Sequence, residues 1–165
     1  MTTHNEHTVN FSQSVEQIHA ALTDPAFWEK VANRFSAASG TVDKFETSES
    51  GTTVVITQSV AAEKIPAQAK KFVKEGVSLT RTISYGPLTD SGLTGTVTTE
   101  TKGVPVSFSA QQQLRAQGEG SVLTTTSDFG IKIPLVGSML EGKATPYLER
   151  VLDAETAVLS QHAQR

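Results

Sequence analysis

The stretch VGSMLEGKATPYLERVLDAETAVLS, residues 136–160, decides the fold that this sequence predicts. Its apolar residues recur at steps of three and four, the spacing of one face of an α-helix, and they are Val136, Leu140, Ala144, Tyr147, Val151, Ala154 and Val158. Leu148, Leu152 and Leu159 widen this face. An apolar face of this length must be buried against an equally long apolar surface. The sequence therefore predicts a helix over 134–164 that packs on a large partner formed by the rest of the chain.

Alternation of apolar and polar residues supplies that partner. It predicts strands at 5–11, 41–47, 52–60, 78–86, 92–101, 104–116 and 121–131. The segment 41–47 is the least regular, because Val42 and Phe45 do not alternate cleanly. Most strands have one mainly apolar face and one face of Thr, Ser, Gln and charged residues. This pattern indicates an antiparallel sheet that is covered on one side and solvated on the other.

Capping residues mark two short helices after the first strand. Ser14 and Gln17 have the spacing of a capping box ahead of an apolar stripe. Asp24 is suited to cap a second helix, with Pro25 in its first turn. Trp28, in this second helix, is expected to pack at the junction between the helix and the sheet.

A basic segment between two of the strands predicts one more short helix. This segment is PAQAKKFVKEG, residues 66–76, and Gly76 ends it. Four lysines cluster in and beside it, namely Lys64, Lys70, Lys71 and Lys74. The cluster is either an ordinary solvated helix face or a surface that attracts an anionic head group.

Composition and charge exclude several classes of protein. The chain has 165 residues, which is the size of a single domain covering 1–165. Its 14 basic and 17 acidic residues give a net charge of −3, which argues against a nucleic-acid-binding protein. It has no cysteine, and no apolar run reaches the ~18 residues of a membrane helix. The N-terminal sequence MTTHNEHTVNF has no signal-peptide pattern, so we expect a cytoplasmic protein without stable membrane insertion.

The sequence shows no motif for catalysis, metal binding or a cofactor. The four histidines lack the spacing of metal ligands. No serine-hydrolase, phosphate-binding or dinucleotide-binding pattern is present. We therefore assign no catalytic residue, no metal and no cofactor, and the sequence favours a protein that is not an enzyme.

Two quoted segments carry a resemblance to a known superfamily. They are FSQSVEQIHAALTDPAFWEKV at the front, residues 11–31, and IPLVGSMLEGKATPYLERVLDAE at the back, residues 133–155. Together with the order of elements, they resemble the START-like superfamily of polyketide cyclases, the major birch pollen allergen and lipid-transfer domains. Within it, the chain resembles the family of unknown function 2505. The resemblance implies an α+β helix-grip fold, in which a bent, antiparallel, seven-stranded sheet wraps around the long C-terminal helix and leaves a cavity between them.

This fold makes burial and the shape of the last helix predictable. Ten residues are expected to be largely buried, namely Phe11, Val54, Ile56, Ile83, Val106, Phe108, Phe129, Leu140, Tyr147 and Val151. The last helix should kink or break near 142–146, because Pro146 removes a hydrogen bond and its ring meets the carbonyl of Gly142. Thr145 could then cap a second segment. Gly137 and Gly142 either form an inconsequential helix start or serve a movable lid that approaches the sheet closely.

Polar residues interrupt the apolar faces of several strands. Arg81 lies between Leu79 and Ile83, and Gln112 lies between Ala110 and Leu114. A buried polar group without a partner is costly. Either a ligand meets these groups, or Arg81 reaches the rim of the sheet or pairs with an acid while the glutamines pair with each other. On the first interpretation, the candidate ligand-binding residues are Gln58, Phe72, Arg81, Ile83, Tyr85, Val97, Phe108, Gln112, Phe129, Met139, Leu140 and Tyr147.

The leading hypothesis is a protein that binds a hydrophobic or amphipathic small molecule, lipid-like or polyketide-like, in a cavity between the sheet and the C-terminal helix. One alternative is a cyclase or aromatase, in which Arg81 would contact an oxyanion and Tyr85 would donate a proton. Another is an interaction protein whose cavity is filled by its own side chains.

Overall fold

The computed structural model describes residues 3–33, 38–60, 76–103, 106–132 and 137–163. The elements within these ranges are β1 (Thr3–Phe11), α1 (Val15–Leu22), α2 (Pro25–Ala32), β2 (Ala38–Ser48), β3 (Gly51–Val60), β4 (Val77–Tyr85), β5 (Leu93–Lys102), β6 (Val106–Gln117), β7 (Gly120–Ile131) and α4 (Gly137–Ala163). Every predicted strand is present within a few residues of its predicted bounds. The predicted helix over 66–76, apart from its final Gly76, lies outside the described residues, as does Phe72.

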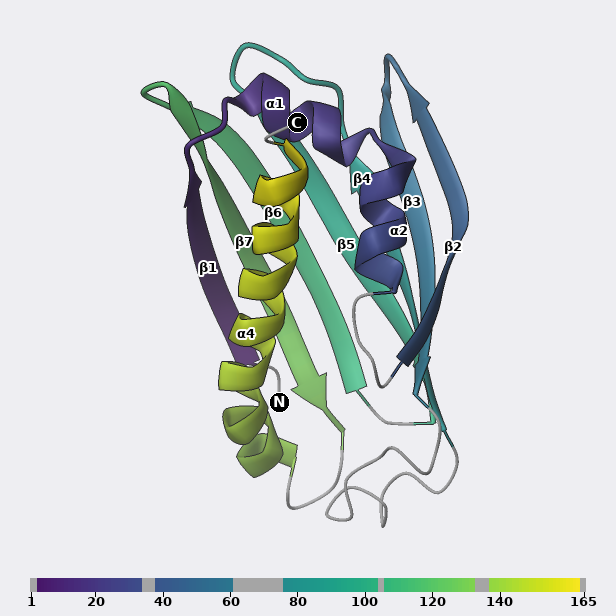
Figure 1. The fold of residues 1–165 in the computed structure, drawn as a ribbon. Helices are drawn as coiled ribbons and strands as arrows, with labels where there is room; N and C mark the ends of the chain where they lie inside the picture. Colours follow the sequence, from purple (N-terminus) through teal and green to yellow (C-terminus); the bar gives the residue numbers. More distant parts are fainter. Residues whose placement is uncertain (1–2, 34–37, 61–75, 104–105, 133–136, 164–165) are drawn as a thin grey trace.

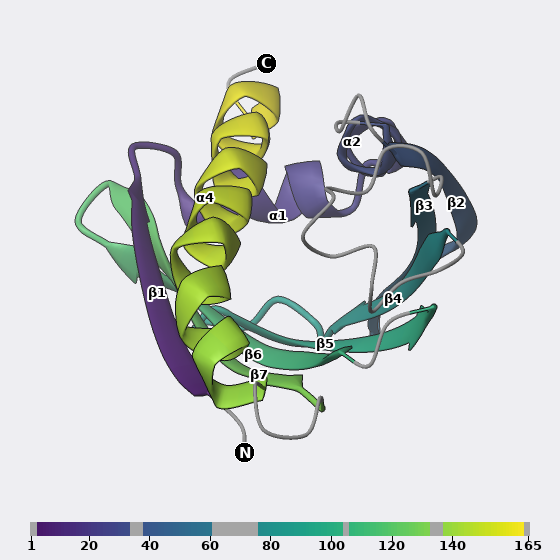
Figure 2. The same ribbon diagram turned by 90° about the horizontal axis from the view of Figure 1, so that it is seen from below.

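The strands form one antiparallel sheet in the order β1-β7-β6-β5-β4-β3-β2. The sheet curves, and α4 lies along the inside of the curve (Figures 1 and 2). There α4 contacts β1 and β7, and it also contacts α1 and α2. The predicted helix-grip fold is therefore confirmed.

Side-chain caps fix the two short helices as the sequence predicts. The Ser14 hydroxyl accepts a hydrogen bond from the backbone N–H of Gln17 at 3.2 Å, and the Gln17 side chain accepts one from the N–H of Ser14 at 2.9 Å. Asp24 Oδ1 accepts from the N–H of Ala26 at 3.0 Å, and Pro25 is the first residue of α2. These bonds satisfy N–H groups that have no partner inside a helix, so both helices begin where local chemistry sets them.

Trp28 joins α2 to the sheet. It is 4% exposed, and its Nε1–H donates to the carbonyl of Leu22 at 2.8 Å. Its ring meets that of Phe27 edge-on at 4.8 Å and lies 6.5 Å from the ring of Tyr85 in β4. The predicted position of Trp28 is confirmed.

An irregularity in β2 explains the broken alternation of the sequence. The pairing of β2 with β3 shifts register between Val42 and Lys44. The bulge inserts one residue, so Val42 and Phe45 both pack against the core although three positions separate them.

Burial follows the prediction in part. Four of the ten predicted residues are buried, namely Phe11, Val54, Ile56 and Ile83. Four others are partly buried, namely Val106, Phe108, Phe129 and Val151. The side chains of Leu140 and Tyr147 lie outside the described part of the structure.

The predicted break in the last helix is wrong. α4 runs without interruption from Gly137 to Ala163 with Pro146 inside it, so Thr145 does not cap a second segment. Gly142 is exposed, and a Cβ added to it would meet no atom within 4 Å. Close approach to the sheet therefore does not explain this glycine. The packing of a 27-residue helix against the sheet outweighs the local cost of Gly142 and Pro146.

Candidate ligand-binding site on the inner face of the sheet

The inner face of the sheet is closed at one end and partly exposed at the other. Near α1, Leu114 and Leu93 are buried, at 1% and 3% exposure. Further along the same two strands, away from α1, Phe108 and Thr99 are only partly buried. Strand β4 shows the same gradient, since it is partly exposed from its start and buried at Ile83 and Tyr85. The described side chains of the inner face are thus less buried at the end of the sheet opposite α1.

A partly buried ion pair joins β4 to α4 in this region. Arg81 of β4 and Glu155 of α4 are 13% and 20% exposed, and Arg81 Nη1 lies 2.8 Å from Glu155 Oε1. Pairing of Arg81 with an acid, one of the alternatives stated from the sequence, is confirmed. The pair satisfies Arg81 incompletely, because Nε and Nη2 have no hydrogen-bond partner among the described residues. Although Glu155 Oε1 is close to Nη1, it also accepts no aligned hydrogen bond.

Other buried polar atoms on the inner face lack partners as well. Thr99 stands opposite Arg81 in the β4–β5 register, and its hydroxyl has no hydrogen-bond partner in the described ranges. The same holds for the Ser127 hydroxyl and the side-chain nitrogen of Asn5, which are register partners in β7 and β1. The Arg81–Thr99 pair on β4 and β5 and the Ser127–Asn5 pair on β7 and β1 therefore lie on either side of β6, which carries Phe108.

Tyr85 and Gln112 satisfy each other. The Tyr85 hydroxyl donates to Gln112 Oε1 at 2.6 Å, and Gln112 Nε2 donates to the Thr125 hydroxyl at 3.2 Å. Burial raises the pKa of Tyr85 far above its ordinary value, and the Glu155 carboxylate adds to this effect more than Arg81 offsets it. Tyr85 is therefore a neutral hydroxyl that is already engaged, which disfavours it as the proton donor of an enzyme.

Gln58 has a structural partner. Its Nε2 donates to the carbonyls of Val31 and Ala32, at 3.5 and 3.3 Å. These carbonyls belong to the last turn of α2, where the helix supplies no further N–H groups of its own four residues on to donate to them. Gln58 therefore fastens α2 to β3, and it does not pair with another glutamine.

The structure brings most of the predicted site residues onto one face. The predicted residues that share the inner face with Gln58 are Arg81, Ile83, Tyr85, Val97, Phe108, Gln112 and Phe129. Met139 is 55% exposed at the start of α4, one position away from the apolar stripe, and we leave it out of the site. Phe72 and the side chains of Leu140 and Tyr147 lie outside the described residues.

Glu155 and Gly95 were missed from the sequence. Glu155 stands four residues after Val151 and four before Leu159, so an acid interrupts the apolar stripe, and that signal could have identified it. Gly95 stands opposite Tyr85 in the register, and a Cβ on it would lie 2.5 Å from Tyr85 Cδ1. The missing side chain makes room for the Tyr85 ring.

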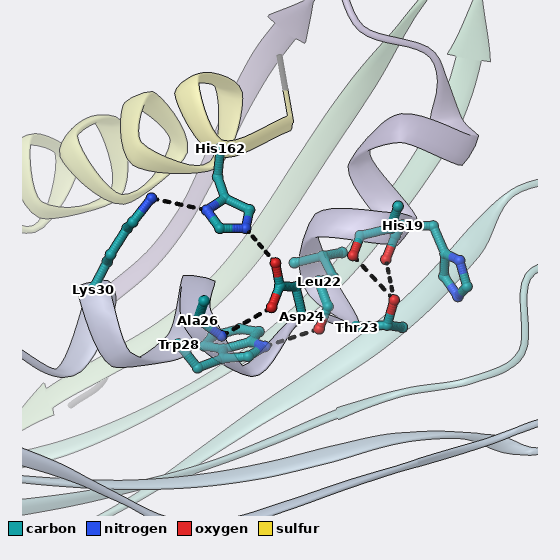
Figure 3. A network of polar contacts seen from close by, with 9 residues as sticks. His19, Leu22, Thr23, Asp24, Ala26, Trp28, Lys30 and His162 are labelled. Atoms are coloured by element: carbon teal, nitrogen blue, oxygen red, sulfur yellow. Dashed lines mark hydrogen bonds and ion pairs between the residues drawn. The ribbon is translucent and has the colours of Figure 1, made fainter. Parts of the chain in front are cut away.

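Histidine–aspartate pairs tie separate elements together outside this site. His162 Nε2 lies 2.7 Å from Asp24 Oδ2, and its Nδ1 lies 3.0 Å from Lys30 Nζ (Figure 3). The hydrogen bond to His162 is the main cause that lowers the pKa of Asp24. His7 of β1 similarly pairs with Asp153 of α4 at 2.7 Å. Through these contacts His162 ties the end of α4 to the start of α2, and His7 ties β1 to α4. No three metal-ligating side chains come together in the described ranges.

A wide depression of about 900 Å³ lies on the outer face of the sheet. Hydroxyl and amide side chains such as Thr53, Thr96 and Gln111 line it. Because it is open to solvent, water can satisfy these groups. The inner face, where buried polar atoms lack partners, is the stronger candidate.

A family model described as protein of unknown function (DUF2505) matches residues 6–162. The chain belongs to this family. A comparison with curated proteins gives no significant match. None of the helices in the described part of the chain is long and apolar enough to cross a membrane.

Several solved structures, one of them described as a START superfamily protein, share the fold. A protein from Thermus thermophilus matches with a TM-score of 0.63 at 11% identity, over 99% of this chain and 97% of its own. The Zhui aromatase/cyclase from Streptomyces sp. R1128 matches with a TM-score of 0.59 at 14% sequence identity, over 99% of this chain and 92% of its own. A START superfamily protein from Mycobacterium smegmatis matches with a TM-score of 0.58 at 14% sequence identity, over 98% of this chain and 97% of its own. At such identities the likeness establishes the fold alone.

Proposed function

We propose that this protein binds an apolar or amphipathic small molecule between the inner face of the sheet and α4. The observation that carries the proposal is the set of buried N–H groups of Arg81 that have no partner in the described structure. Buried polar groups are normally hydrogen-bonded, and each exception calls for an explanation. A ligand that enters from the partly exposed end of the inner face would supply the missing acceptor.

The surroundings of Arg81 match the usual composition of a small-molecule site, which is mostly apolar with a few placed polar groups. Phe108 and Phe129 face each other across β6 and β7 and are only partly buried. Thr99, next to Arg81 in the register, adds a hydroxyl. A protein from Streptomyces with the same fold is an aromatase/cyclase, as its name states. By analogy of fold, it supports a ligand here without identifying one.

A pair of substitutions on neighbouring positions of β5 tests the proposal. Thr99→Trp would fill the inner face beside Arg81, whereas Thr98→Trp would place the same ring on the exposed outer face. Binding of an apolar fluorescent probe is measured for both variants and the unchanged protein, with circular dichroism and the thermal midpoint as checks of folding. We expect Thr99→Trp to abolish probe binding and Thr98→Trp to preserve it.

Native mass spectrometry of the protein purified from its own host complements this test, because a bound small molecule would appear as added mass. If the unchanged protein takes up no probe and carries no added mass, the interior is filled by its own side chains and the proposal is wrong. Equal probe binding by the two folded variants would place the probe elsewhere and would also contradict it.

A further inference from the structure

We propose that the ligand is electrically neutral and presents a carbonyl oxygen to Arg81, so that the Arg81–Glu155 pair excludes carboxylic acids and amines. This inference rests on the proposed function and narrows it to one chemical class. Two observations on the inner face support it. The first is the pairing of charges, and the second is the set of Arg81 N–H groups without acceptors.

Among the residues that the structure describes, the charges of the site are balanced before any ligand enters. The positive charge of Arg81 faces the negative charge of Glu155 at 2.8 Å. Tyr85, on the same face of β4 as Arg81, stays neutral because burial raises its pKa. His7 and Asp153 form a separate pair from β1 and α4, and Asp153 is 68% exposed.

A second carboxylate beside Arg81 would leave two anions around one buried cation. Such an arrangement is unfavourable, since charges withdrawn from water need a partner each. An amine beside Glu155 would place a second cation next to one anion that already faces Arg81. A neutral molecule avoids both costs.

Arg81 leaves hydrogen-bond donors without acceptors among the described residues, and Glu155 Oε1 is an acceptor without an aligned donor. A guanidinium carries five N–H groups and no acceptor. Nη1 faces Glu155, whereas Nε and Nη2 are buried with no partner among the described residues. A carbonyl oxygen accepts two hydrogen bonds and can engage both nitrogens or one nitrogen and the Thr99 hydroxyl. The neutral group that fits is therefore a ketone, ester or amide on an apolar body that packs against Phe108 and Phe129.

The test compares three ligands with the same twelve-carbon chain, namely dodecan-2-one, dodecanoic acid and dodecylamine. Their affinities are measured at pH 7 by displacement of the apolar fluorescent probe. For the unchanged protein, we expect the ketone to bind at least about tenfold more tightly than either charged ligand, which corresponds to 1.4 kcal/mol.

Glu155→Gln should reverse part of this preference. It removes the negative charge at nearly constant volume and leaves the charge of Arg81 unpaired. We expect the ratio of acid to ketone affinity to rise about tenfold. Glu100→Gln is the matched control, because Glu100 is an exposed acid on the outer face of β5, and its ratio should not change. If Glu155→Gln does not fold, Arg81→Lys keeps the positive charge but loses the spare N–H groups, and it should lower the affinity for the ketone while acids stay excluded.

The outcomes separate this inference from the proposed function. If the probe binds but the acid displaces it as well as the ketone does, the ligand class is wrong while the binding site stands. An unchanged ratio in folded Glu155→Gln likewise overturns the role of the ion pair. If the unchanged protein binds neither probe nor ketone, the proposed function fails together with the inference.

Discussion

Replacement of Trp28 should separate the contribution of packing from that of a hydrogen bond at the junction of α2 and the sheet. Trp28→Ala removes a side chain that is 4% exposed and contacts the ring of Phe27. Truncation of a buried aromatic residue to alanine costs about 3–5 kcal/mol. Trp28→Phe keeps a ring in the same place but leaves the carbonyl of Leu22 without its 2.8 Å donor, at a cost of about 1–3 kcal/mol. The expected order of stability is therefore the unchanged protein, then Trp28→Phe, then Trp28→Ala.

Urea denaturation followed by far-ultraviolet circular dichroism measures these differences. Tryptophan fluorescence is unsuitable, because Trp28 is the only tryptophan and both variants lose it. Glu29→Ala, at the exposed neighbouring position, is the control and should change the free energy of unfolding by no more than about 0.5 kcal/mol. A loss below about 1 kcal/mol for Trp28→Ala would refute the reasoning. Equal losses for the two Trp28 variants would refute the division between packing and hydrogen bond.

Three further predictions concern pH and two glycines. The pKa of Asp24 is lowered from 3.8, chiefly by its hydrogen bond with His162, so the stability that this carboxylate contributes is present above about pH 4 and is lost as the pH falls through the lowered pKa. Asp24→Asn should therefore be less stable than the unchanged protein at pH 6, with a difference that shrinks at pH 3, and a constant difference would contradict this. Gly142→Ala should raise stability by up to about 1 kcal/mol, because the added methyl meets open space, and a lower thermal midpoint would show a hidden constraint. Gly95→Ala should cost about 1–3 kcal/mol in denaturant unfolding, because its Cβ would collide with the Tyr85 ring, and an unchanged value would show that the ring moves aside.

The sequence by itself determined the order of the elements, and the resemblance that this order carries implied the fold class. Local signals suffice for the elements: Ser14 and Asp24 cap helices through neighbouring backbone groups, and strand alternation depends only on which residues are adjacent. Local signals misled at Pro146. They predicted a kink or break in α4, and the break does not occur, because the energy of packing a long apolar face against the sheet keeps the helix continuous.

Only the tertiary structure decided how the polar groups inside the fold are satisfied. The sequence shows that Arg81 interrupts an apolar face, but Glu155 becomes its partner only because α4 crosses the sheet at one particular height and rotation. In the same way, Gln58 meets the end of α2, Gln112 meets Tyr85, and His162 reaches Asp24 across 138 positions of sequence. The physical reason is the sequence distance over which each interaction acts. Helix and strand periods are set by residues close together in the chain. A buried charge or amide, in contrast, bonds to whichever group the packing brings within hydrogen-bonding distance.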